Sequence, residues 1–158
     1  MNLHDKKLLA PVLDRLLDSG ARTNGSQPHQ VLRQLRESVR RDLEILFNTR
    51  YRCISPPAGC KELSSSLLNF GLADLATINL SSVEHRKRFC SDIESTILKY
   101  EPRIKSVKVT SDQKLDAENP CITFRVEAVL HTNPAPELII FDSALDLITQ
   151  SVDVSEIQ

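Results

Sequence analysis

The stretch Tyr100-Glu101-Pro102-Arg103-Ile104 marks a change in the character of the sequence. Before it, apolar residues recur at helical spacing, and after it they alternate as in β-strands. Proline cannot continue a helix and favours extended geometry in the preceding residue, so we expect a helix to end at Glu101. In an extended tripeptide, Glu101 and Arg103 lie on the same side. The stretch is therefore either a helix stop with two solvated charges or a rigid recognition corner.

The composition is that of one globular domain of ordinary size. The chain has 158 residues, of which 41% are hydrophobic and 26% are charged, which is too apolar for a disordered protein. Its 20 Lys and Arg residues face 21 Asp and Glu residues, for a net charge of -1, so there is no bulk basic field for nucleic acid. No apolar run could span a bilayer and no signal-peptide core follows the start, so we expect a cytoplasmic protein without direct membrane insertion.

Nothing in the sequence assembles a catalytic, cofactor or metal site. The four cysteines contain no Cys-x-x-Cys pair, so we expect reduced thiols and no metal. They are Cys53, Cys60, Cys90 and Cys121. The histidines are scattered and no phosphate-binding glycine loop is present. Because the elements of an active site are missing, we expect no enzyme and no cofactor.

The N-terminal region is predicted to be a short amphipathic helix on a linker. Val12, Leu13, Leu16 and Leu17 share one side of it, and the polar stretch 21–27 follows. A helix this short is unstable alone in water, so it either docks on its own domain or folds on a partner as a hook. We accordingly divide the chain into residues 1–27, a helical segment and linker, and residues 28–158, a single domain.

Helical spacing predicts a first long helix from about Ser26 or Pro28 to Phe47. Its apolar stripe comprises Leu32, Leu35, Val39, Leu43 and Leu46, and we expect its charged side to be solvated. Asn48-Thr49 competes for backbone groups and ends the helix, which leaves Arg50 on a loop.

Two further helices are predicted before the corner. A short one from Glu62 to Leu72 would be closed by Gly71 in a left-handed conformation. The capping box Ser81-Ser82-Val83-Glu84 opens a long helix that runs to Tyr100. Near its start lies the basic cluster His85-Arg86-Lys87-Arg88, which is either solvated or faces an acidic partner.

The rest of the chain is predicted to form a sheet. One strand runs from Ile104 to Thr110 with Val107 and Val109 buried, and the next buries the even-numbered residues 122–130. The stretch 138–141 is apolar on both faces and should be central or covered, and Ser143 and Leu145 extend the odd-numbered face of Phe141. A tail strand around 152–154 leaves an unpaired edge, which is either protected or open to a further strand.

Six blocks of the sequence recur, in the same order, in one known family. They are Arg41-Asp42-Leu43-Glu44-Ile45-Leu46-Phe47-Asn48-Thr49-Arg50, Leu13-Asp14-Arg15-Leu16, residues 66–75, residues 100–104 with Glu101-Pro102-Arg103, residues 124–128 and residues 141–146. Each block alone is a weak signal, and the six in order are specific. They resemble the TssE family of type VI secretion baseplate subunits, which is related to the wedge proteins, or sheath initiators, of contractile-tailed phages. Ala73 replaces a usual proline and Phe47 a usual leucine, which affects only local loop shape and packing.

This resemblance implies a non-enzymatic structural subunit that links the baseplate wedge to the sheath and starts sheath assembly by strand pairing. It implies the wedge subunits TssF, TssG and TssK and the sheath proteins TssB and TssC as partners. The partner-binding residues that it implies are Glu101, Pro102, Arg103, Asn48 and Arg50, with Leu13, Arg15 and Leu16 of the hook and Phe141, Ser143 and Leu145 of the sheet. Charge reversal at Glu101 or Arg103 is then expected to weaken partner capture and leave the fold intact.

We therefore expect an α+β fold with two main helices and a short one packed on a small, mostly antiparallel sheet, plus the N-terminal hook. Two other functions stay open. One is a lysozyme-like cell-wall glycosidase, which a muramidase assay tests and which no paired-carboxylate motif supports. The other is a nucleic-acid adaptor that uses Arg33, Arg36, Arg40 and Arg41, which salt-dependent binding would support.

Overall fold

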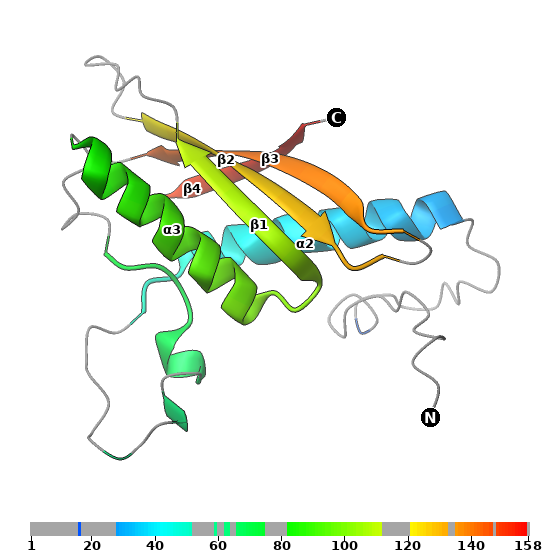
Figure 1. The fold of residues 1–158 in the computed structure, drawn as a ribbon, viewed down its shortest axis with the longest axis horizontal. Helices are drawn as coiled ribbons and strands as arrows, with labels where there is room; N and C mark the ends of the chain where they lie inside the picture. The colour runs from blue at the N-terminus through cyan, green and yellow to red at the C-terminus, as the bar shows by residue number, and fades with distance from the viewer. Residues whose placement is uncertain are drawn as a thin grey trace.

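Two helices pack on one face of a four-stranded antiparallel sheet in the computed structural model (Figure 1). The structure describes residues 28–51, 62–63, 66–74, 82–111, 121–132, 135–146 and 148–157, together with Leu16 and Gly59. The helices are α2 (Pro28–Asn48) and α3 (Val83–Tyr100), with the 3-10 turn η2 (Leu67–Asn69) between them. The strands are β1 (Ile104–Ser111), β2 (Cys121–Leu130), β3 (Glu137–Asp146) and β4 (Val152–Ile157), and they neighbour one another in chain order. The α+β prediction is confirmed.

Each long helix buries one apolar stripe against the sheet. On α2 the buried residues are Leu35, Val39, Leu43, Leu46 and Phe47, whereas Leu32 is half-buried. On α3 they are Phe89, Cys90, Ile93 and Ile97. Val83 lies at the start of α3 and is 53% exposed, where it lines an open groove. Within the described residues, neither helix has an apolar stretch long enough to cross a membrane.

The two ends of α3 are defined by specific backbone contacts. Ser82, one residue later than a cap at Ser81, is the N-cap, and its hydroxyl accepts a hydrogen bond from the Glu84 N–H at 3.3 Å. Ser81 itself lies outside the described residues. At the other end the Glu101 N–H donates to the Ile97 carbonyl at 2.8 Å, and the chain then leaves the helix before Pro102, as predicted.

One face of the sheet packs against the two helices. β2 buries Ile122, Phe124, Val126, Ala128 and Leu130, as its alternation predicts. The Phe124 ring lies edge-to-face with Phe47 of α2 and Phe89 of α3, at centroid distances of 5.6 and 6.1 Å. One aromatic ring therefore joins both helices to the sheet. β3 is central, as expected, but its second face is not covered throughout, since Leu138 is 58% exposed.

The predicted helix from Glu62 to Leu72 is not formed as one element, and η2 ends at Asn69. Its polar side chains bond to the backbone locally: the Ser66 hydroxyl and the Asn69 amide both donate to the Leu63 carbonyl, at 2.9 and 2.7 Å. Such bonds compete with helix formation.

Gly71 does not cap a helix but lets two chain segments meet. Its φ of 114° brings Leu72 beside the end of α2, where Leu72 and Arg50 form a parallel bridge. The Leu72 N–H donates to the Thr49 carbonyl at 2.8 Å, and the Tyr51 N–H donates to the Leu72 carbonyl at 3.2 Å. Arg50, expected on a loop, is therefore held in this bridge.

Substitution of Gly71 by alanine should destabilise the fold by more than about 2 kcal/mol, because the positive φ strains alanine and the new methyl group meets backbone. Its Cβ would lie 2.3 Å from the Thr49 carbonyl oxygen. Gly59→Ala is the matched control, since Gly59 has a φ of 112° but no atom within 4 Å of the new Cβ. Urea unfolding measures both variants. Equal losses of stability would contradict the close approach at Thr49.

Candidate functional site

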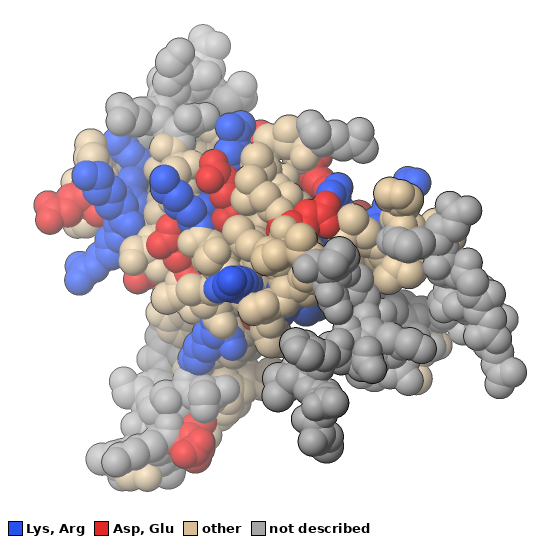
Figure 2. Space-filling model, turned by 45° about the vertical axis from the view of Figure 1, so that its right-hand side comes forward, with Lys and Arg blue, Asp and Glu red and all other residues tan. Residues whose placement is uncertain are grey.

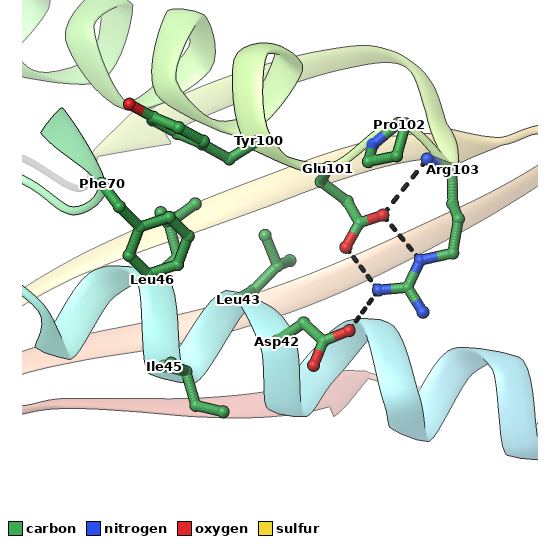
Figure 3. A pocket seen from close by; sticks show the side chains of 9 residues that line it. All are labelled: Asp42, Leu43, Ile45, Leu46, Phe70, Tyr100, Glu101, Pro102 and Arg103. Carbon is green, nitrogen blue, oxygen red and sulfur yellow. Dashed lines mark hydrogen bonds and ion pairs between the residues drawn. The ribbon is translucent and has the colours of Figure 1, made fainter. Parts of the chain in front are cut away.

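The corner between α3 and β1 holds its two charges against each other (Figure 3). The Arg103 Nε donates to Glu101 Oε1 at 2.6 Å, and its Nη2 pairs with Glu101 Oε2. The Arg103 backbone N–H also donates to Oε1, at 3.2 Å. Glu101 is only 5% exposed, so its carboxylate is bonded inside the protein. The tripeptide is not extended as predicted but forms a turn, in which the Ile104 N–H donates to the Glu101 carbonyl at 3.2 Å, and this turn brings the two side chains together.

The same guanidinium reaches across to α2. The Arg103 Nη1 donates to the hydroxyl of the buried Ser38 at 3.0 Å, and Nη2 also pairs with Asp42. Burial alone would lower the pKa of Arg103, but the hydrogen bonds and charges of Glu101 and Asp42 outweigh it and raise the pKa. We call these four residues, Ser38, Asp42, Glu101 and Arg103, the arginine clamp. The clamp ties the α3–β1 corner to α2.

The clamp changes the interpretation of the corner's charges. The family resemblance implies that Glu101 and Arg103 contact a partner, and that reversal of either charge leaves the fold intact. Reversal of either charge would instead place like charges together at a largely buried site, which is strongly destabilising. The expectation of an unaffected fold is therefore corrected.

An apolar pocket of about 360 Å³ opens beside the clamp. Its lining comes from α2, from the segment after η2 and from the corner: Asp42, Leu43, Ile45, Leu46, Phe70, Tyr100, Glu101, Pro102 and Arg103. Figure 3 shows Asp42, Glu101 and Arg103 at one end and the rings of Phe70 and Tyr100 at the other. The Phe70 and Tyr100 rings lie edge-to-face, with centroids 5.1 Å apart. The site can thus receive an apolar group beside a fixed set of charges.

Asn48 and Arg50, also predicted to bind a partner, bond within the chain. The Asn48 side-chain amide pairs with both backbone groups of Val152, accepting from its N–H at 2.8 Å and donating to its carbonyl at 2.8 Å. Arg50 donates to the Gln150 carbonyl at 2.7 Å. Both residues fix the end of α2 beside the start of β4. The edge of β4 that the sequence left unpaired is therefore covered at Val152.

The remaining predicted contact residues lie elsewhere. Phe141, Ser143 and Leu145 are at most 2% exposed and point into the core, so their side chains are not available to a partner. Their alternation was the signal of a buried face. Leu13 and Arg15 lie outside the described residues, and Leu16 is 76% exposed.

The charged side of α2 is bonded to the sheet rather than only solvated. Arg36 pairs with Glu137 of β3 and Glu156 of β4, and Arg40 donates to the Val154 carbonyl at 3.1 Å. Arg36 and Arg40, which belong to the nucleic-acid alternative, are therefore held by internal contacts. Figure 2 shows basic and acidic side chains interspersed on the face that it presents.

Two of the cysteines are described, and both carry free thiols. Cys121 is exposed, whereas burial raises the pKa of the Cys90 thiol. Cys53 and Cys60 lie outside the described residues. In the part of the chain that the structure describes, no three His, Cys, Asp or Glu residues are grouped as metal ligands.

Arg103→Met should lower the free energy of unfolding by about 3 kcal/mol, because it leaves the buried Glu101 carboxylate without its cation. Arg125→Met is the matched control, since the side chains of Arg125 and Asp142 are 50% and 45% exposed, and we expect it to cost less than about 1 kcal/mol. Thermal and urea denaturation of both variants give the comparison. If the two variants lost the same stability, the clamp would not be a major support of the fold.

Comparison with known proteins places this architecture in a family. The family model for the baseplate wedge protein gp25 matches residues 33–135. The anti-adapter protein IraD of Salmonella paratyphi A is 30% identical over 125 residues, covering 79% of this chain and 82% of the relative. The IraD protein of Salmonella arizonae is 33% identical over 124 residues, covering 78% and 82%.

Among solved structures, a chain of the baseplate complex from the type VI secretion system has the same fold. It aligns with a TM-score of 0.53 at 20% sequence identity, covering 80% of this chain and 96% of that one. The family match covers α2 from residue 33 onward, all of α3, β1 and β2, and the four clamp residues. This chain belongs to the family of the baseplate wedge protein gp25.

Proposed function

We propose that this chain is a cytoplasmic structural subunit of the baseplate of a type VI secretion contractile injection machine. The observation that carries the proposal is membership of the gp25 family over residues 33–135, a range that includes blocks 41–50 and 101–103. The fold shared with a chain of a type VI baseplate complex agrees with it. The partners that we propose are the wedge subunits TssF, TssG and TssK.

The pocket beside the arginine clamp is the contact that we assign to the wedge. An apolar side chain of a wedge subunit would be buried against Leu46, Phe70 and Tyr100, with Asp42 and the exposed Pro102 beside it. In this arrangement Glu101 and Arg103 shape one wall of the pocket rather than reach out to the partner. The clamp would then preorganise the contact, which lowers the cost of binding.

We further propose that the sheet starts sheath assembly by strand pairing with TssB or TssC. An open antiparallel sheet with two edge strands, β1 and β4, supports this role. Closed sheets lack such edges, and buried edges cannot accept a strand.

The role that we propose is not enzymatic. A glycosidase needs two carboxyl groups free to act as acid and as base or nucleophile. The two carboxylates of the pocket, Asp42 and Glu101, are both bonded to Arg103. This pairing disfavours the lysozyme-like alternative at the pocket.

A second candidate is an anti-adapter role, in which the chain binds an adapter protein. The 30% and 33% identity to two IraD anti-adapter proteins favours it, because those matches cover about four-fifths of each relative. The same pocket could serve either partner. Capture experiments therefore separate the two candidates.

Ile45→Glu should abolish most of the capture of a co-expressed TssF–TssG pair, by about tenfold or more, because a charge replaces an apolar rim residue of the pocket. Ile45 is 49% exposed, so the fold should tolerate the change. Leu98→Glu is the matched control, since Leu98 is 47% exposed on α3 and does not line the pocket. We expect capture by that variant to stay within about twofold of the wild-type protein.

Thermal denaturation would verify that both variants fold. Full capture by Ile45→Glu would reject the pocket as the wedge contact. Failure of the wild-type chain to capture any wedge subunit would reject the baseplate role, and capture of an adapter protein instead would establish the second candidate.

A further inference from the structure

The outward backbone groups of β4 are largely occupied by α2. The Asp146 N–H donates to the Ser151 carbonyl, so the neighbouring pair Leu145 and Val152 exchanges no backbone hydrogen bonds. Such pairs alternate with bonded pairs along an antiparallel ladder, and the N–H and C=O groups of Val152, Val154 and Glu156 therefore point away from β3. Asn48 bonds both groups of Val152, and Arg40 bonds the Val154 carbonyl. A strand that joined β4 would have to displace these three hydrogen bonds.

The outward edge of β1 is more open. The His131 N–H donates to the Arg103 carbonyl, so the pair Ile104 and Leu130 exchanges no backbone hydrogen bonds. The register shifts between Ile104 and Ser106, and beyond this shift the backbone groups that point away from β2 are those of Val107, Val109 and Ser111. Among the described residues, one side chain bonds these outward backbone groups: the Glu94 carboxylate accepts from the Val109 N–H at 2.7 Å. A joining strand would have to displace a single hydrogen bond.

A groove of about 290 Å³ runs between α3 and this edge. Figure 1 shows α3 lying alongside β1. The groove is lined by Val83, Lys87, Cys90 and Glu94 of α3 and by residues 109–111 of β1, among others. Lys87 belongs to the basic cluster at residues 85–88, which no function assigned so far uses. Positive charge is unfavourable at a helix N-terminus, so an anionic partner would relieve it.

We propose that β1 is the edge at which a partner strand joins the sheet, and that the strand is an extended segment whose carboxylates face the basic cluster. This proposal rests on the strand-pairing part of the proposed function. Main-chain hydrogen bonds to Val107, Val109 and Ser111 would supply affinity, and charge complementarity at Lys87 would select the partner and its register. Glu94 would leave the Val109 N–H when the strand enters.

Hydrogen exchange in the complex with the purified TssB–TssC pair tests which edge is used. We expect the amides of residues 107–111 to exchange at least about tenfold more slowly in the complex, and those of residues 154–157 to stay within about twofold. Protection at residues 154–157 alone would overturn this proposal and leave sheath pairing intact. No binding of the sheath pair would overturn the strand-pairing function itself.

The charge preference has its own matched pair of variants. Lys87→Glu should weaken binding of the TssB–TssC pair by about tenfold at physiological salt, whereas Lys99→Glu should change it by less than about twofold. Both lysines are exposed on α3, but Lys99 lies in the last turn of the helix, outside the groove and away from the β1 edge residues 107–111. Glu94→Gln should strengthen binding, because it removes a repelling charge and keeps an acceptor for the Val109 N–H. Equal effects of the two lysine variants on binding would overturn the proposal that carboxylates of the partner strand face the basic cluster.

Discussion

The arrangement of this fold depends on the hydrogen bonds and ion pairs that the Arg103 guanidinium makes. It bonds Glu101 at the end of α3 and both Ser38 and Asp42 of α2. The Phe124 ring also joins the two helices, but apolar contact is not directional. Charge-assisted bonds from a planar guanidinium are directional, so the clamp fixes how the corner sits over α2. The pocket between Leu46, Tyr100 and the clamp exists because that placement is fixed.

The helices have a second role in addition to covering the core. α2 sends Asn48 and Arg40 to the edge of β4, and α3 sends Glu94 to the edge of β1. Side chains that bond an edge strand prevent unwanted association of sheets. The protection is unequal, because the amide of Asn48 satisfies both groups of one residue whereas Glu94 satisfies one N–H. A protein whose edge strands are protected in this way can stay monomeric and still accept a selected strand.

Local pattern was sufficient to predict the elements but not the contacts between them. The helical spacing of apolar residues predicted α2 and α3, and the alternation of apolar residues predicted β2. Pro102 predicted where α3 ends. The pairing of Arg103 with Asp42 and of Asn48 with Val152 joins residues 61 and 104 positions apart, and no local pattern encodes such contacts. The burial of Phe141 and Leu145 was present in the alternation, but the family resemblance led to their assignment as partner contacts. Near η2 the side chains of Ser66 and Asn69 hydrogen-bond to the backbone, and these bonds compete with the helix that the spacing predicts there.

The most direct measurement is a structure of this chain bound to the TssF–TssG wedge pair. We predict an apolar wedge side chain between Phe70, Tyr100 and Leu46, with Arg103 still bonded to Glu101 and Asp42. The contradictory result would be an empty pocket, with Arg103 released from Asp42 and bonded to a carboxylate of the partner.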